Sequence, residues 1–263
     1  MATHRKCIYI VTGHSRGVGK EVTKALLSRG DTVFGFSRNK ITLENQTPNL
    51  NLLKEYKWDF SQNVFSAPLQ ETRNELKKFS SLVFILNAAK NTGRTDNPNN
   101  FLEDLSELIQ INFTNQILLL NSLIKDINFE RIDCLCVGSY SSFLKDNQSS
   151  VGYILSKNLL GDLSVRSSFS GVKNLNFKTI FFAGIATGMY EIKLTSSSLN
   201  KIPLSRRFSF LFRQTPEEAA AKILKSLASK KVVIFYPSYL AFPVVLWACI
   251  RNIYSVVSGL WTR

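Results

Sequence analysis

Short β-rich runs alternate with helical patterns along almost the whole chain, and this alternation constrains the fold more than any other feature of the sequence. A helix that connects two strands of this kind makes them parallel, and the usual right-handed crossovers place helices on both faces of the sheet. We therefore expect a doubly wound, Rossmann-like α/β fold with a parallel sheet of about seven strands. The expected strands are residues 7–12, 32–37, 53–58, 82–86, 132–137, 177–182 and 231–236.

The helical patterns between these strands complete the expected architecture. The pattern at 216–229 begins most clearly, because Thr215 can cap it, Pro216 suits the first helical position, and two glutamates follow near the positive end of the helix dipole. With 263 residues and 44% hydrophobic content, the chain can bury one sizeable core. We expect a single domain over residues 1–263. The expected helices are residues 18–29, 64–79, 102–127, 152–169 and 216–229.

Three glycines stand between the first expected strand and the first expected helix. Gly13, Gly17 and Gly19 lie in the stretch VTGHSRGVG, where the backbone must turn tightly and approach a ligand closely. The amino terminus of the helix that follows suits a pyrophosphate. This position favours a nucleotide-binding turn over a simple strand-to-helix connection.

The spacing T-G-x-x-x-G-x-G is one of several marks that resemble the short-chain dehydrogenase/reductase family. The resemblance covers roughly residues 5–236 and implies a Rossmann-like fold and oxidoreductase activity. Ala89 stands where the family has a glycine. The other matching marks are Asn87-Ala88 after the fourth strand, Asn112 in the long helix at 102–127, Ser139 at the end of the fifth strand, and Tyr153 with Lys157 in YILSK.

Tyr153 and Lys157 carry the expected chemistry. Hydride delivery to a carbonyl leaves an alkoxide that needs a proton donor, and a tyrosine can supply that proton. A phenol has a pKa of about 10, so a nearby ammonium would have to lower it toward the working pH. Lys157 lies four residues after Tyr153, on the same helix face. By resemblance, Lys157 also holds the nicotinamide ribose, Ser139 hydrogen-bonds the substrate oxygen, and Asn112 anchors a water in the proton relay.

Two serines close to Ser139 leave its assignment open. Ser141 and Ser142 follow in the stretch GSYSS, and either could take its place if the loop is shifted.

The end of the second strand indicates the cofactor. An NAD site needs a carboxylate there to accept from the ribose hydroxyl, and the sequence has Ser37 instead. Arg38 follows directly and Arg16 precedes the second glycine, so two guanidiniums could clasp a 2′-phosphate. By resemblance, Asp59 contacts the adenine. We therefore expect NADP(H). The expected cofactor-binding residues are Gly13, Arg16, Gly17, Val18, Gly19, Ser37, Arg38, Asp59, Asn87, Ala88, Tyr153, Lys157, Gly184 and Thr187.

The stretch FFAGIATGM departs from the family pattern. Ala183-Gly184 stands for the usual Pro-Gly, and Thr187 comes one residue early for its contact with the nicotinamide amide. The resemblance makes residues 185–215 the loop that covers the substrate. Its only acid is Glu191, which favours an apolar or anionic substrate.

Residues 237–263 form an apolar C-terminal tail. Residues 232–250 contain no charge, Arg251 follows, and a second apolar run comes after it. A membrane span is disfavoured because residues 232–236 are needed as the last strand and because Pro237 and Pro243 interrupt the rest. The composition suits a subunit contact in a homo-oligomer or a peripheral contact with a membrane surface equally well.

Charge, cysteines and the first residues exclude other classes of protein. The net charge is +14, but its lysines and arginines are scattered and lack interleaved aromatics, so we expect no nucleic-acid partner. Four cysteines and two histidines in this arrangement indicate reduced thiols and no metal site. The first twenty residues lack the pattern of a signal peptide, so we expect a cytoplasmic protein, with membrane association through the tail as an alternative.

These observations predict an NADPH-dependent reductase that converts a ketone or aldehyde into an alcohol, or the reverse. Its partner would be a small carbonyl substrate. The alternative is a protein of the same fold that binds NADP without turnover and serves as a regulator or scaffold.

Overall fold

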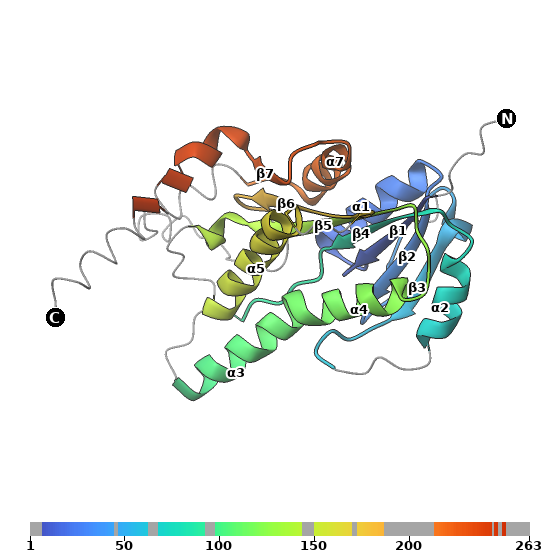
Figure 1. Cartoon of the computed structure of the whole chain (residues 1–263), viewed down its shortest axis with the longest axis horizontal. Coiled ribbons are helices and arrows are strands. Elements are labelled where there is room, and N and C mark those ends of the chain that lie inside the picture. The colour runs from blue at the N-terminus through green and yellow to red at the C-terminus, as the bar shows by residue number, and fades with distance from the viewer. Residues whose placement is uncertain are drawn as a thin grey trace.

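Seven strands form one parallel sheet in the order β3-β2-β1-β4-β5-β6-β7 (Figure 1). The computed structural model describes residues 7–44, 47–62, 68–92, 98–143, 150–169, 173–186, 213–243, 245–246 and 249–250. The expected doubly wound α/β fold is therefore confirmed. The strands are β1 (Cys7–Thr12), β2 (Thr32–Ser37), β3 (Leu53–Lys57), β4 (Ser81–Leu86), β5 (Arg131–Ser139), β6 (Leu175–Phe182) and β7 (Val233–Tyr236).

All seven strands lie where the sequence predicts them, and the differences are confined to their ends. β5 continues beyond residue 137 because Gly138 and Ser139 still pair with Phe181 and Phe182 of β6. β7 begins two residues later than expected, because its pairing with β6 starts at Val233.

The helices also follow the prediction, with one correction. The expected single helix at 102–127 is divided by a π-helical turn (Gln110–Thr114), which separates α3 from α4. The N-cap prediction for Thr215 is confirmed, since its Oγ1 accepts from the N–H of Glu218 over 3.2 Å. The α-helices are α1 (Gly17–Ser28), α2 (Pro68–Leu76), α3 (Pro98–Ile109), α4 (Asn115–Ile124), α5 (Val151–Ser167) and α7 (Pro216–Leu227).

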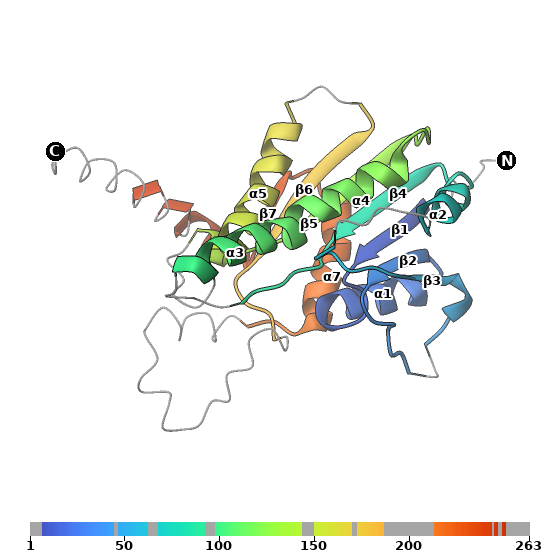
Figure 2. The ribbon, with the colours of Figure 1, turned by 90° about the horizontal axis from the view of Figure 1, so that it is seen from below.

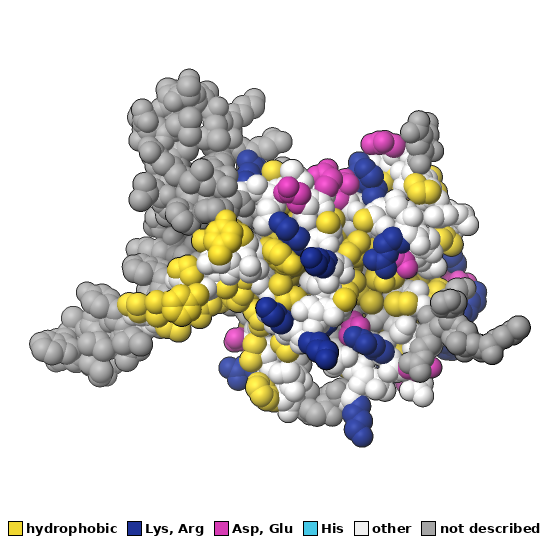
Figure 3. Space-filling view, turned by 90° about the horizontal axis from the view of Figure 1, so that it is seen from above, with side chains coloured by type: hydrophobic (Ala, Val, Ile, Leu, Met, Phe, Trp, Pro, Cys, Tyr) yellow, Lys and Arg dark blue, Asp and Glu magenta, His cyan; other side chains and the backbone are white. Residues whose placement is uncertain are grey.

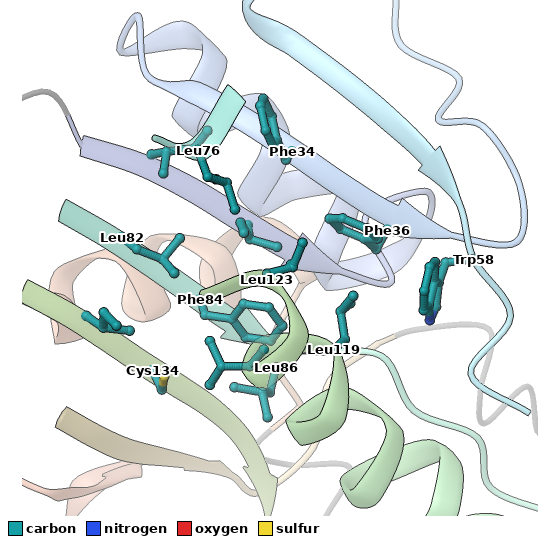
Figure 4. Packing of buried hydrophobic residues seen from close by; sticks show 14 of the residues in the cluster. Phe34, Phe36, Trp58, Leu76, Leu82, Phe84, Leu86, Leu119, Leu123 and Cys134 are labelled. Atoms are coloured by element: carbon teal, nitrogen blue, oxygen red, sulfur yellow. The ribbon is translucent and has the colours of Figure 1, made fainter. Parts of the chain in front are cut away.

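Helices cover both faces of the sheet (Figure 2). On one face, α2, α4 and α5 pack on a core that includes Phe34, Phe84 and Leu119 (Figure 4). On the other face, α1 and α7 pack on Val11 and Ile85. Burial of each such side chain contributes about 1.5–3 kcal/mol. Because both faces are covered, the central strands β1 and β4 are almost entirely apolar and buried, whereas the edge strand β3 carries two lysines and a glutamate.

Within the part of the chain that the structure describes, no helix is both long enough and apolar enough to cross a membrane. Cys7, Cys134, Cys136 and Cys249 are all free thiols. Burial raises the pKa of Cys136 to about 12, so this thiol stays protonated at neutral pH.

Candidate active site

The strand order reverses between β1 and β4, and two of the predicted cofactor-binding stretches, the glycine turn and Asn87-Ala88, lie at this reversal. From β1 the chain builds β2 and β3 on one side, and from β4 it builds the remaining strands on the other. In such sheets a ligand crevice opens at the carboxyl ends of the two strands where the order reverses. The glycine turn follows β1 and Asn87 follows β4, so both lie at this crevice.

The glycine turn needs its glycines for conformation and for packing. Gly13 (φ 67°) and Gly17 (φ 56°) have a left-handed backbone conformation, which residues other than glycine rarely adopt. The N–H of Gly13 donates to the carbonyl of Phe36 over 2.8 Å and ties the turn to β2. A Cβ at Gly13 would lie 2.9 Å from the Cα of Ala88, and a Cβ at Gly19 would collide with the carbonyl of Gly13. The glycines therefore let α1 begin directly against the ends of β1 and β4.

Hydrogen bonds between Asn87 and Thr12 join the end of β4 to the end of β1. The Nδ2 of Asn87 donates to the carbonyls of Thr12 over 3.1 Å and Gly13 over 3.3 Å. The Oγ1 of Thr12 accepts from the N–H groups of Asn87 over 2.9 Å and Ala88 over 3.0 Å. These bonds hold the turn against the end of β4, so Asn87 and Ala88 lie beside the glycine turn. Their contact with a cofactor stays a prediction.

The amino end of α1 fits an anion. Arg16 is its N-cap residue and makes no side-chain capping hydrogen bond, and the first turn of the helix contains no acidic residue. The N–H groups of Gly17, Val18 and Gly19 belong to this first turn, where helix donors lack partners within the helix. Such an end attracts phosphate oxygens.

Tyr153 and Lys157 lie one turn apart on α5 and are buried against β5. The Nζ of Lys157 donates to the carbonyl of Val137 over 2.8 Å and lies 5.8 Å from the centroid of the Tyr153 ring. Only 3% of Lys157 and 6% of Tyr153 are exposed. Burial lowers the pKa of Lys157 from 10.5 to about 8, against a smaller opposing effect of Cys136. The predicted pairing of a lysine with the tyrosine is thus present in the structure.

The directions of β5 and α5 indicate how Ser139 lies relative to Tyr153. β5 runs toward the carboxyl edge of the sheet, and α5 packs on β5 while running in the opposite direction, away from that edge. From Val137 to Ser139 the strand advances two residues, about 7 Å. From Lys157 back to Tyr153 the helix covers four residues, about 6 Å, in the same direction. Because the Nζ of Lys157 contacts Val137, these similar steps indicate that Ser139 and Tyr153 lie at about the same distance along the sheet.

The three candidate serines differ in the hydrogen bonds that their hydroxyl groups make. The Oγ of Ser139 lies 2.6 Å from the Oγ of Ser141 and also accepts from the N–H of Ser141 over 3.2 Å. Ser139 and Ser141 are therefore coupled. The Oγ of Ser142 is buried and has no hydrogen-bond partner among the described residues. Ser139, at the strand end, keeps the position that the sequence predicts.

Asn112 lies in the π-helical turn and is fully buried. Its Nδ2 donates to the carbonyl of Lys90 over 2.9 Å and to the Oγ of Ser156 over 3.0 Å, and its Oδ1 accepts from the N–H of Lys90 over 2.8 Å. Ser156 in turn donates to the carbonyl of Tyr153 over 2.7 Å. Asn112 therefore joins the segment after β4 to α5. Its role as an anchor for water stays a prediction.

Gln116 is a residue of the site region that the sequence does not reveal. Its Oε1 accepts from the hydroxyl of Thr12 over 2.6 Å, and its Nε2 donates to the carbonyls of Ala88 and Asn112, each over 2.9 Å. It is fully buried. The sequence feature that could have indicated its role is a glutamine on an apolar helix face, because a buried amide needs hydrogen-bond partners.

The residues expected around the adenosine differ in what they contact. Arg16 and Arg38 are exposed, and neither has an ion pair with a described carboxylate. The hydroxyl of Ser37 donates to the carbonyl of Asn39 over 2.6 Å and so shapes the turn after β2. The pKa of Asp59 is lowered overall: burial raises it, but hydrogen bonds from Ser61 and the charge of Arg38 outweigh burial. Arg38 and Asp59 thus lie on the same side of the crevice.

Gly184 lies at the base of the segment expected to cover the substrate. Its carbonyl accepts from the N–H of Gln214 over 3.0 Å, and the N–H of Ala186 donates to the carbonyl of Gln214 over 2.8 Å. These bonds close the base of the segment beside β6. Thr187 and the rest of the segment, residues 187–212, lie outside the described residues.

Comparison with known proteins identifies the fold. No protein-family model matches the sequence, and no curated protein matches it. A short-chain dehydrogenase from Streptomyces avermitilis aligns over 99% of this chain and 96% of its own, with 16% identity and a TM-score of 0.66. The Pseudomonas aeruginosa protein RhlG, solved as an active-site complex with NADP, aligns over 89% and 97%, with 18% identity and a TM-score of 0.60. A 4-hydroxyisoleucine dehydrogenase complexed with NADH aligns over 87% and 96%, with 18% identity and a TM-score of 0.64. The chain therefore has the fold of the short-chain dehydrogenases, as the resemblance of its motifs implies.

Proposed function

We propose that the protein is an oxidoreductase that uses NADP(H) to reduce a ketone or aldehyde to an alcohol, or to carry out the reverse reaction. The observation that carries this proposal is the contact of Lys157 with the carbonyl of Val137. We infer from this contact that Tyr153 lies level with Ser139, close to the carboxyl edge of the sheet at which the glycine turn follows β1. A buried lysine next to a buried tyrosine has a desolvation cost that packing alone does not explain.

The residues around the crevice fit a dinucleotide. The amino end of α1 offers unpaired N–H groups for a pyrophosphate, and its first turn has no carboxylate to repel one. The close packing of Gly13 and Gly19 on the end of β4 keeps this helix end at the crevice. When bound, the nicotinamide would supply or accept the hydride.

The chain's own residues supply the proton and the orientation. Tyr153 donates a proton from its hydroxyl to the substrate oxygen, on which negative charge develops during reduction. The ammonium of Lys157 favours the phenolate left behind, since an opposite charge stabilises the ionised form. Ser139 donates a hydrogen bond to the same substrate oxygen and orients the carbonyl. In alcohol oxidation the proton moves the opposite way.

The choice of NADP(H) over NAD(H) rests on the end of β2. Among the similar structures, RhlG was solved with NADP and the 4-hydroxyisoleucine dehydrogenase with NADH, so the fold accommodates either cofactor. In this chain Ser37 stands where a carboxylate would accept from the ribose, and Arg16 and Arg38 are exposed in the turns that follow β1 and β2. Neither guanidinium makes a direct ion pair with a described carboxylate, although the charge of Arg38 lowers the pKa of Asp59, and both guanidiniums suit a 2′-phosphate.

The replacement of Tyr153 by Phe tests the proposal. We expect Tyr153→Phe to remove carbonyl reduction and leave NADPH affinity nearly unchanged, because it deletes the proton donor and little binding surface. NADPH oxidation is followed by absorbance with aliphatic, aromatic and sugar carbonyls, and binding by nicotinamide fluorescence. Tyr56→Phe on β3 is the matched control and should keep full activity. Retention of most activity by Tyr153→Phe would overturn the catalytic assignment, whereas NADPH binding without turnover in either direction would favour the non-catalytic alternative.

A further inference from the structure

The C-terminal apolar segment is defined here as the described residues between 238 and 250, which are 238–243, 245–246 and 249–250, and it projects from the body of the protein. It begins with the short helix η6 (Ser238–Leu240) and leaves the fold at the carboxyl edge of the sheet (Figures 1 and 2). Large apolar side chains of this segment are exposed to water, whereas Leu240 packs on the body. The exposed side chains are Tyr239 (64%), Phe242 (75%), Val245 (39%), Leu246 (45%) and Ile250 (49%).

Figure 3 shows hydrophobic side chains gathered where this segment leaves the body. An apolar surface of this kind on a folded domain marks a site of contact with another phase or molecule.

The root of the segment is fixed beside the candidate active site. The hydroxyl of Tyr140 donates to the carbonyl of Pro237 over 2.7 Å, and its ring stacks on Phe235 with centroids 5.6 Å apart. Tyr140 directly follows Ser139 in the chain. Whatever the segment binds is therefore held near the carboxyl edge of the sheet, where Ser139 ends β5.

The charge of the C-terminal region selects the kind of partner. Between Ile192 and Arg263 the only acidic residues in the sequence are Glu217 and Glu218, whereas lysines and arginines recur up to Lys231 and return at Arg251 and Arg263, on both sides of the uncharged stretch 232–250. Lys222 lies at the root of the segment, with its Nζ 5.3 Å from the centroid of the Tyr236 ring. A cationic region with exposed aromatic and aliphatic side chains complements an anionic, partly apolar surface.

We propose that the C-terminal apolar segment docks the protein on an anionic lipid surface, with the carboxyl edge of the sheet close to that surface. A second copy of this chain fits less well, because it carries the same net charge of +14 and the same basic C-terminal region. Like charges brought together at an interface oppose association, whereas anionic lipid headgroups attract them. The docking surface does not depend on the proposed oxidoreductase activity, and binding can be measured without a substrate.

Vesicle flotation with the full-length protein tests the proposal. The vesicles contain equal parts of phosphatidylcholine and phosphatidylglycerol, and a second set contains phosphatidylcholine alone. We expect the wild type to float with the anionic vesicles, more weakly with phosphatidylcholine alone, and less in high salt because salt screens the attraction. The triple variant Phe242→Ser, Leu246→Ser, Ile250→Ser should lose binding at least about tenfold, because it removes exposed apolar area that would enter the lipid interface.

A matched variant distinguishes this segment from exposed apolar residues elsewhere. Leu102→Ser, Val165→Ser and Phe169→Ser together remove three side chains that are 65%, 43% and 83% exposed on the body. This variant should float like the wild type, and both variants should keep the wild-type melting temperature. A wild type that stays in solution with anionic vesicles would overturn the proposal, as would equal flotation of the wild type and the segment variant. A segment variant with a smaller oligomeric mass and unchanged vesicle binding would assign the segment to a contact between copies.

Discussion

The Nε2 of His14 lies 2.8 Å from the Oε1 of Glu55, and this contact joins the glycine turn to β3. The same oxygen of Glu55 accepts from the N–H of Ile41 over 2.7 Å. The imidazole is 1% exposed and packs on Gly35, where the ring would collide with a Cβ. Glu55 therefore holds the turn after β1 and the segment after β2 at a fixed distance, and that segment carries Arg38.

We expect Glu55→Ala to weaken NADPH binding by about tenfold and to lower the free energy of unfolding by about 1–3 kcal/mol. The change removes both hydrogen bonds of the carboxylate and leaves the buried imidazole without its partner. NADH binding should fall less, since Arg38 would have no 2′-phosphate to contact. Titration with both cofactors and urea unfolding measure the two effects.

Glu75→Ala is the control for Glu55, because Glu75 makes only exposed ion pairs with Lys54 and Lys78. It should change neither quantity by much. Equal losses of affinity for NADPH and NADH in Glu55→Ala would show that Glu55 does not act through Arg38.

Lys157 should make the cofactor-free protein less stable at neutral pH than a neutral residue would. Burial lowers the pKa of Lys157 from 10.5 in the unfolded chain to about 8 in the folded protein. The ammonium form is therefore less favourable in the folded state than in the unfolded state. The loss of folding stability caused by this difference is fully present below pH 8 and declines as the pH rises from about 8 to about 10.5. Lys157→Met should therefore raise the free energy of unfolding at pH 7 by about 1–3 kcal/mol, less than the pKa shift alone implies because the hydrogen bond to Val137 is lost.

The advantage of Lys157→Met should shrink between pH 7 and pH 9.5 in urea unfolding. Lys225→Met, at an exposed position on α7, provides the baseline and should show no such trend. A stability difference that stays constant over this range would mean that Lys157 keeps an ordinary pKa in the folded protein.

Much of the fold follows from local sequence, whereas the polar network of the site does not. The central strands β1 and β4 are buried on both faces and so appear as short apolar runs, and the glycine spacing encodes a backbone conformation. The bond between Thr12 and Gln116 joins residues 104 positions apart, and the contact of His14 with Glu55 joins residues 41 apart. No local pattern marks such pairs. The π-helical turn also escaped prediction, because the helical periodicity continues on both sides of Gln110–Thr114.

Arg38 should discriminate between the two nicotinamide cofactors. It is exposed beside the turn after β2, so Arg38→Ala removes a guanidinium with little effect on folding. We expect NADPH affinity to fall by about tenfold to a hundredfold, the range of one charge-assisted contact, and NADH affinity to change little. Lys40→Ala, an exposed cation two residues away, is the control. Equal losses for both cofactors in Arg38→Ala would place recognition of the 2′-phosphate elsewhere.

Replacement of Asn112 and of Asn115, which lie three residues apart, can distinguish an effect on turnover from an effect on stability. Both are buried, but Asn112 joins Lys90 to Ser156 of α5, whereas Asn115 donates to the carbonyl of Phe60 over 2.6 Å, away from α5. Replacement of either by Leu removes hydrogen bonds inside the protein and should cost about 2–4 kcal/mol of stability. Only Asn112→Leu should lower the turnover of carbonyl reduction, because Ser156 donates to the carbonyl of Tyr153 and helps to hold it. The KM for NADPH should change little in both variants. If Asn115→Leu lowers turnover as much as Asn112→Leu, the link through Ser156 does not position Tyr153, and the effect of Asn112 is one of stability alone.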